Sequence, residues 1–247
     1  MPLLEIKNLT KYYSRSGSYF KVLDNLDLCV NEGDFCQIVG RSGSGKSTLL
    51  NIISNLIEID GGELIFDGKQ IKSFTDITTS DREDVDEMIK REKNHVYSLP
   101  ENIAYMPQGI KLLPNLTVWQ NIRLAYDLYA QKKQIFIKEA DFVSYAEELI
   151  VRSKIMDILD SYPASLSGGE NKRVQLVRSL LLKPRLLLCD EPLSDLDAVS
   201  RQEIMELLFE CNKFTTIIMV THDLDYVNKT ICYTMTEGRL ERGICLL

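Results

Sequence analysis

Apolar and polar residues alternate in the first part of the chain over short runs that predict strands. The alternation over Leu3–Leu9 is weak, as in a strand with one face in water. Val22–Val30 is a second such run, and the turn residues Asn31-Glu32-Gly33-Asp34 end it. Gly61-Gly62 introduces a third, which Asp67-Gly68 closes. The first part of the chain is therefore predicted to be rich in β-structure.

Three largely apolar runs predict strands that are buried on both faces. They are Phe35–Val39, Arg185–Cys189 and Thr216–Val220. The last two are almost continuously apolar, which suits central strands of a parallel sheet that is covered by helices on both sides.

Helical periodicity dominates the middle of the chain. Thr117 and Gln120 have the spacing of a capping box, which marks a helix start. Lys138–Arg152 predicts a second amphipathic helix. Residues 109–165 are therefore predicted to be helical and to be inserted between two strand-rich parts. The apolar residues at helical spacing in the first of these helices are Val118, Ile122, Ala125, Tyr126 and Tyr129.

The stretch Lys69–Pro100 is polar and charged. Ser80 and Glu83 again have the capping-box spacing, and apolar residues at helical spacing follow them. The pattern predicts a surface helix. This helix is either a solvated insert without a dedicated partner or a segment that binds one.

Composition narrows the class of protein. A length of 247 residues suits one or two domains, and the net charge of −7 argues against nucleic-acid binding as the main function. The first residues do not form a signal peptide, and no apolar run approaches the length of a membrane span. The six cysteines form no C-x-x-C pair, so buried reduced thiols are expected in place of disulfides or a zinc site. We expect a soluble, cytoplasmic protein.

A glycine-rich loop lies directly between the run Phe35–Val39 and a predicted helix start. It fits the phosphate-binding pattern G-x-x-x-x-G-K-[ST]. Its glycines allow backbone N–H groups to surround a phosphate chain, and the helix N-terminus adds positive charge. Lys46 can reach the β- and γ-phosphates, and the Ser47 hydroxyl can ligate Mg²⁺. A glycine-rich turn with a chance lysine is the alternative, which the flanking strand and helix disfavour. The loop residues are Gly40, Arg41, Ser42, Gly43, Ser44, Gly45, Lys46, Ser47 and Thr48.

Two carboxylates end the apolar run after Pro184. Asp190 is placed to hold Mg²⁺, and Glu191 can orient or deprotonate an attacking water. Two adjacent carboxylates at the end of a buried strand would otherwise be costly, which favours a functional interpretation.

Shortly before that strand stands Leu166-Ser167-Gly168-Gly169-Glu170. Ser167 can cap the helix that follows, and the two glycines leave its N-terminal amides bare. The stretch is therefore a second candidate anion site, without a lysine. Ser-Gly-Gly alone is also a common loop sequence. Its position shortly before Asp190-Glu191 favours the functional interpretation.

With these motifs, nearly the whole chain resembles the nucleotide-binding domain of ATP-binding cassette (ABC) transporters. The resemblance implies an α/β fold of the P-loop NTPase type, with a mostly parallel sheet, an N-terminal antiparallel β subdomain and an inserted α-helical subdomain. It implies one ABC ATPase domain over residues 1–247, with residues 1–108 and 166–247 as the catalytic core and 109–165 as the helical subdomain.

The resemblance also implies roles for single residues. Tyr13 matches the aromatic residue that stacks on adenine, with Tyr12 as its rival. Gln108 matches the glutamine that senses the γ-phosphate and Mg²⁺, and His222 matches the histidine that contacts the γ-phosphate. Glu191, His222 and Gln108 are thereby the expected catalytic residues, and Ser47, Gln108 and Asp190 the expected metal site. The stretch Ser167, Gly168, Gly169 and Glu170 matches the signature motif, and Asp197 belongs to the loop expected to cross a dimer interface.

Two positions depart from the family pattern. Glu170 stands where many members have glutamine, and Asp195 stands where a small alanine is common. The first variant is familiar in the family, and the second adds a carboxylate beside the expected dimer interface.

The implied activity is ATP hydrolysis with ATP and Mg²⁺ in a head-to-tail dimer of two ABC ATPase chains. The implied partner is a transmembrane permease subunit, with this chain on the inner face of the cell membrane. Loop details look most like the lipoprotein-release and macrolide-exporter branch. The apolar residues Ile110, Leu112 and Leu113 are expected either to dock that permease or to be core. Two rivals remain: a non-transport ABC ATPase acting in DNA repair, chromosome maintenance or translation, and a regulatory ATP-binding partner such as those of cell-division complexes.

Overall fold

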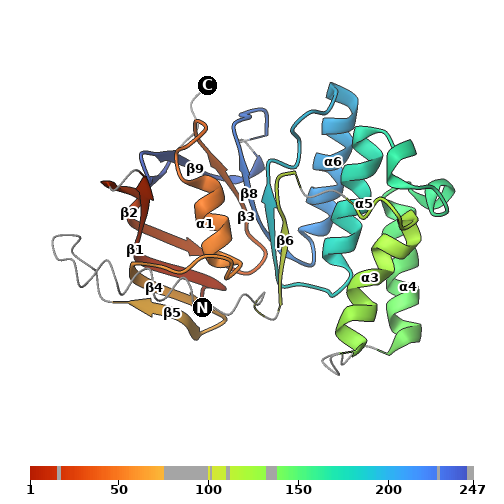
Figure 1. Ribbon diagram of the computed structural model, residues 1–247, viewed down its shortest axis with the longest axis horizontal. Helices are drawn as coiled ribbons and strands as arrows, with labels where there is room; N and C mark the ends of the chain where they lie inside the picture. Colours follow the sequence, from red (N-terminus) through yellow and green to blue (C-terminus); the bar gives the residue numbers. More distant parts are fainter. Residues whose placement is uncertain are drawn as a thin grey trace. The chain divides into compact units, whose positions relative to one another are not determined.

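The computed structural model divides by its internal contacts into two compact units, which we describe separately (Figure 1). The first unit is Met1–Glu101 with Thr216–Leu247, and the second is Asn102–Thr215. The surface helix predicted after Ser80 lies outside the described residues. The structure describes residues 1–15, 18–74, 100, 102–109, 112–131, 138–226 and 229–243.

The first unit contains an antiparallel sheet of four strands. These are β1 (Leu4–Arg15), β2 (Ser18–Val30), β4 (Gly61–Phe66) and β5 (Lys69–Phe74), in the order β2-β1-β4-β5. The strands predicted from alternation all belong to it. Strand β1 continues well beyond Leu9, where the alternation predicted its end. Lys11 interrupts the apolar pattern, yet it is buried in an ion pair with Asp60 at 3.3 Å. A prediction from apolar residues alone therefore ends the strand too early, because it treats lysine as a solvent-exposed residue.

The same unit holds a second group of strands in the order β10-β9-β3-β8. Strand β3 (Phe35–Val39) runs parallel to β8 (Thr216–Thr221) and β9 (Ile231–Thr236), and β10 (Arg239–Arg242) is antiparallel to β9. Every residue of β3 and β8 is buried, as their apolar runs predicted. Helix α1 (Lys46–Ile53) is drawn between the two groups of strands in Figure 1.

The second unit combines a parallel strand pair with four α-helices. Strands β6 (Ile103–Met106) and β7 (Leu186–Asp190) pair in parallel. Helix α5 (Gly168–Leu180) packs against β6 and against three further helices of this unit. Those helices are α3 (Val118–Gln131), α4 (Glu139–Arg152) and α6 (Ala198–Cys211). The fold class is therefore the predicted one, α/β with an antiparallel sheet and mostly parallel strands. The predicted boundaries of a helical subdomain, 109–165, stay a prediction.

The cysteines follow the expectation only in part. Cys36, Cys189 and Cys211 are buried free thiols, and burial raises the pKa of Cys36 and of Cys211 to about 12. Cys29 is a free thiol but exposed, because it lies on the outward face of β2. Cys232 is disulfide-bonded, against the expectation. Within the described residues, no helix has the length and apolar character that crossing a membrane requires.

Candidate functional site

The glycine-rich loop Gly40–Thr48 joins β3 to α1 in the first unit. Gly43 and Gly45 have φ values of 81° and 109°, in the left-handed region that favours glycine. Gly40 needs glycine for a different reason, because a Cβ there would lie 2.5 Å from the backbone oxygen of Met235. The loop therefore has the tight backbone path that the phosphate-binding pattern predicts.

Lys46 is the first residue of α1 and lies almost buried in this loop. Its ammonium donates to the backbone oxygens of Gly40 at 2.7 Å and Arg41 at 3.1 Å. No described side chain caps the N-terminus of α1. The first amides of a helix that lacks a capping side chain are free to bind an anion, and the dipole of the helix favours negative charge there. The loop thus fits the phosphate chain of a nucleotide.

Tyr12 and Tyr13 are consecutive residues of β1 and lie on opposite faces of it. The pairing with β2 shifts register between Lys11 and Tyr12, because Lys11 pairs with Leu23 and Tyr12 with Lys21. Tyr13 shares a face with Lys11, whose Nζ is 5.7 Å from the centroid of the Tyr13 ring. Lys11 pairs in register with Leu23, and a Cβ on Gly45 would lie 2.8 Å from Leu23 Cδ2. Paired residues of an antiparallel sheet share a face. The Tyr13 face is therefore the one that touches the glycine-rich loop.

Tyr12 has a different environment on the other face of β1. The ammonium of Lys21 lies 5.4 Å from the centroid of its ring. The backbone N–H of Tyr12 donates to Asp60 Oδ2 at 2.7 Å. The buried Lys11–Asp60 pair thus fixes the backbone at the point where the two tyrosines diverge, which local sequence patterns did not reveal.

His222 follows the last residue of β8, at the end of a fully buried strand. Its side chain is exposed. The next residue is held from two sides: the backbone N–H of Asp223 donates to Thr221 Oγ1 at 3.0 Å, and Gln37 Nε2 donates to its backbone oxygen at 2.9 Å. The backbone around His222 is thereby fixed while its imidazole stays accessible.

In the second unit, Asp190 and Glu191 stand at the end of β7 and both are buried. The phenol of Tyr105 on β6 donates to Asp190 Oδ2 at 3.4 Å. Burial raises the pKa of Tyr105, so the phenol keeps its proton. Glu191 has a φ of 50°, in the left-handed region. The chain turns sharply at Glu191, directly after the buried strand.

The predicted signature stretch forms the start of α5. Ser167 Oγ accepts from the backbone N–H of Glu170 at 3.2 Å, and Glu170 Oε2 accepts from the backbone N–H of Ser167 at 2.7 Å. This capping box confirms the cap predicted at Ser167 and lowers the pKa of Glu170. Ser167 and Gly168 are exposed, so this helix end is open to a partner.

The loop after Glu191 packs directly under this helix end. Asp197 caps α6, since its Oδ1 accepts from the backbone N–H groups of Val199 and Ser200, both at 3.0 Å. A Cβ on Gly169 would lie 2.8 Å from Ser200 Oγ, and one on Gly168 would lie 3.3 Å from Leu196 Cδ2. The two glycines therefore let the loop and α6 approach α5.

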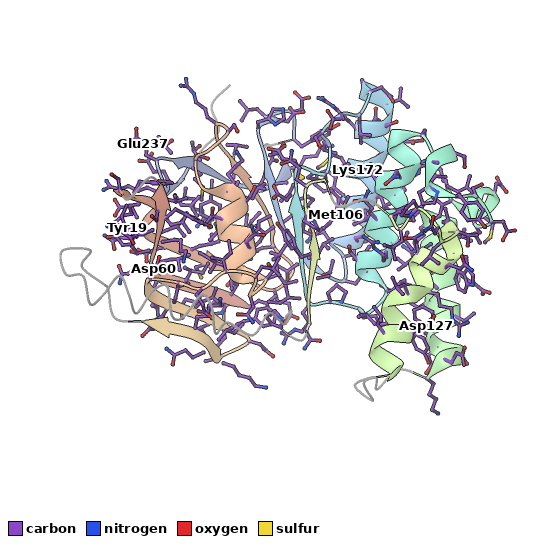
Figure 2. The ribbon with its side chains drawn as sticks, in the orientation of Figure 1. Tyr19, Asp60, Met106, Asp127, Lys172 and Glu237 are labelled. Carbon is purple, nitrogen blue, oxygen red and sulfur yellow. The ribbon has the colours of Figure 1, made fainter. Side chains whose placement is uncertain are left out.

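Lys172 is a residue of this region that sequence reasoning missed (Figure 2). Its Nζ donates to the backbone oxygen of Glu191 at 3.4 Å. Burial lowers the pKa of Lys172, and the charge of Asp195 is the strongest influence in the opposite direction. An isolated lysine on a helix is ordinarily a solvated residue, and only its position five residues after Ser167 could have pointed to a role.

Gln108 follows β6 and is exposed. Of the apolar residues after it, Leu112 is buried, which makes it core, and Leu113 is exposed. Ile110 lies outside the described residues. The buried Asn121 of α3, also missed from sequence, holds this segment: its Oδ1 accepts from the backbone N–H of Leu113 at 2.7 Å.

The oxygen donors at these positions suit the expected metal ion. The Ser47 hydroxyl and the Asp190 carboxylate are hard ligands of the kind that Mg²⁺ prefers. Ser47 is exposed in the first unit, and Asp190 ends β7 in the second.

A family profile and curated relatives both relate this chain to ABC transporters. A family profile described as ABC transporter matches residues 23–194. The methionine import ATP-binding protein MetN of Haemophilus ducreyi is 34% identical over 232 residues, which are 93% of this chain and 60% of that protein. MetN of Pasteurella multocida is 33% identical over 247 residues, 98% of this chain and 65% of that protein. The chain thus spans about three fifths of the length of these curated relatives.

Solved structures show the same likeness. The ATP-binding cassette MJ0796, in a dimeric post-hydrolysis state with ADP and phosphate, has a TM-score of 0.75 and 28% identity, with 97% of each chain covered. CbiO1 of Clostridium perfringens, part of the ABC transporter complex cbiONQ, has a TM-score of 0.72 and 25% identity, with 97% of this chain and 87% of that chain covered. The expected exporter branch is not confirmed by these relatives.

Proposed function

The chain belongs to the ABC transporter family, and from this membership we propose that it is the ATP-binding and ATP-hydrolysing subunit of a transporter. The observation that carries the proposal is the glycine-rich loop around Lys46. Its backbone path requires glycines, and it leads into a helix whose N-terminus no described side chain caps. Those are the features that bind the phosphates of a nucleotide.

Each site residue then has a chemical role. Lys46 and the loop amides hold the β- and γ-phosphates, and Tyr13 stacks on the adenine. Ser47, Gln108 and Asp190 would hold Mg²⁺, which would neutralise charge on the phosphates. Glu191 orients the attacking water and accepts its proton. Gln108 and His222, both exposed, contact the γ-phosphate.

A second copy of the cassette is part of the proposal. Ser167 caps α5, and both Ser167 and Gly168 are exposed. The backbone amides of the first turn of α5 therefore lie at an exposed helix N-terminus, which favours an anion. A partner's nucleotide can reach this helix end in a head-to-tail dimer. The dimeric state of the MJ0796 cassette supports the presence of a second copy.

We propose that the membrane partner is a separate permease subunit and that the chain is peripheral on the inner face of the cell membrane. Leu113 is 45% exposed and lies in the segment that follows Gln108. This exposed leucine, five residues after Gln108, is our candidate for the surface that docks the permease. The buried Leu112 is not part of that surface. MetN is named for methionine import, which supports transport over the rival roles in DNA repair, translation or cell division.

The decisive experiment is ATP hydrolysis by the purified chain and by two variants. We expect Glu191→Gln to bind ATP and form ATP-bound dimers, while turnover falls by about 10²–10⁴-fold, as for loss of a general base. We expect Lys46→Ala to lose ATP binding. Normal turnover by Glu191→Gln would contradict the assignment.

Mixing variants tests the shared site. A Lys46→Ala chain and a Ser167→Arg chain should each fail to form a closed dimer, whereas their mixture contains dimers with one intact composite site. Binding of a nucleotide analogue should partly recover in the mixture. If both single variants bind and hydrolyse like the original chain, the head-to-tail arrangement is wrong.

A further inference from the structure

We propose that Lys172 is a positioning residue for hydrolysis, which ties helix α5 to the main chain between Glu191 and Asp195. The inference rests on the proposed function, because it concerns the residue assigned as general base. It assigns a role to a lysine that no motif of the sequence includes.

Three donors converge on the backbone oxygen of Glu191. The ammonium of Lys172 approaches it to 3.4 Å. The hydroxyl of Ser194 donates to the same oxygen at 2.9 Å, and the backbone N–H of Ser194 does so at 3.2 Å. The two contacts from Ser194 close a local turn, whereas Lys172 is 19 residues away in the chain and belongs to another element. Lys172 therefore makes a side-chain hydrogen bond that links α5 to this turn.

The main chain at this turn has an uncommon conformation. Glu191 has a φ of 50° and Asp195 a φ of 62°, both in the left-handed region that residues with a Cβ rarely adopt. Such conformations persist where surrounding contacts hold them. A change in the bonds to the Glu191 carbonyl would alter the path of the main chain at Glu191, and with it the position of the carboxylate that we assign to the attacking water.

Electrostatics keep Lys172 in this position. The carboxylates that act on it are those of Asp195, Asp190 and Glu191, with Asp195 first among them. A half-buried ammonium among carboxylates is stable because the opposite charges offset part of its desolvation. Asp195, which departs from the family pattern, is thus the carboxylate whose charge raises the pKa of Lys172 most.

The linkage has a mechanical consequence. Lys172 lies one turn after Gly168, at the end of α5 that carries the predicted signature. When a nucleotide of the second chain binds this helix end, movement of α5 is transmitted through Lys172 to the backbone of Glu191. The general base is then brought into position only when the dimer has closed.

The test is the steady-state ATPase activity of Lys172→Met, whose side chain has similar length but no donor and no charge. We expect kcat to fall by about 10- to 100-fold, which is the cost of a misplaced reacting group, while KM for ATP and the unfolding midpoint stay within about 2-fold and about 2 °C of the original chain. Lys172→Arg should restore most of the activity. Lys154→Met, which removes an exposed lysine of the same unit, is the matched control and should leave kcat unchanged.

A double-mutant cycle with Asp195→Ala tests the pairing. Removal of Lys172 should cost at least about 2-fold less in kcat when Asp195 is already alanine, because the two side chains interact. A kcat of Lys172→Met within about 2-fold of the original chain overturns the proposal. If Lys172→Met does not fold, Lys172→Gln is measured by the same criteria. Failure of the proposed function looks different, because then the original chain and Lys46→Ala hydrolyse ATP equally poorly.

Discussion

Gly169 of α5 and Ser200 of α6 approach each other so closely that a Cβ on Gly169 would lie 2.8 Å from Ser200 Oγ and 3.1 Å from Ser200 Cβ. Ser200 cannot easily withdraw, because its hydroxyl donates to Asp197 Oδ2 at 2.9 Å and its backbone N–H donates to Asp197 Oδ1 at 3.0 Å. The glycine is therefore required by packing within the chain, apart from any contact with a nucleotide.

From this contact we expect Gly169→Ala to lower the free energy of unfolding by about 1–3 kcal/mol, the usual cost of overpacking. Gly168→Ala is the matched control. Its Cβ would meet the flexible end of Leu196 at 3.3 Å, so a smaller loss is expected. Urea denaturation of both variants gives the comparison, and equal losses would show that the Ser200 contact is not decisive.

Sequence patterns predicted those strands whose burial can be recognised from their own run of apolar residues. Strands β3 and β7 were found because each residue in them is buried and nearly all are apolar. The extent of β1 was missed, since Lys11 is buried against Asp60, which stands 49 positions along the chain. No local pattern of apolar residues carries that information.

Asn121 holds the segment before α3, and its loss is predicted to destabilise the chain. Its side-chain nitrogen donates toward the backbone oxygens of Leu113, Leu116 and Thr117 at 3.0–3.1 Å, and the whole residue is buried. Asn121→Leu leaves these groups without their partner in a buried place, which should cost about 2–3 kcal/mol of unfolding free energy.

The control for Asn121 is its exposed neighbour Gln120. Gln120 Oε1 accepts the backbone N–H of Thr117 at 2.9 Å, at the exposed start of the helix. Gln120→Ala should therefore cost less than about 1 kcal/mol in the same denaturation experiment. Equal effects of the two substitutions would contradict a structural role for the buried amide.

The capping box at Ser167 predicts an acid-sensitive part of the stability. The hydrogen bonds from Ser167 hold the pKa of Glu170 below its ordinary 4.5. Because the folded pKa is the lower one, this stabilisation is complete above pH 4.5 and is lost as the pH falls through the folded value. Glu170→Gln keeps an acceptor without titrating, so its unfolding midpoint should fall less steeply below pH 4.5. Identical acid profiles would show that Glu170 does not contribute.

As for the fold, the functional residues that could be predicted from sequence are those whose motif is contiguous in the chain. The glycine-rich loop could be predicted because its strand, its glycines and Lys46 are contiguous in sequence. Lys172 and Asn121 could not, because their roles depend on backbone groups that the fold supplies: the Glu191 carbonyl for the former and the segment before α3 for the latter. Motifs locate the reacting groups, and the structure reveals what holds them.

The choice between Tyr12 and Tyr13 as the adenine partner is open to a direct test. The register places Tyr13 on the face of β1 that touches the glycine-rich loop, through Lys11, Leu23 and Gly45. Tyr12 lies on the other face, where it contacts Lys21. Loss of one aromatic stacking contact with a base costs about 1–3 kcal/mol, and about 1.4 kcal/mol is tenfold in affinity. We therefore expect Tyr13→Ala to weaken ATP binding about 10-fold or more, and Tyr13→Phe to keep most of it. Tyr12→Ala should change the affinity less than about 2-fold. Titration with a fluorescent ATP analogue measures all three, and a larger effect at Tyr12 would reverse the assignment.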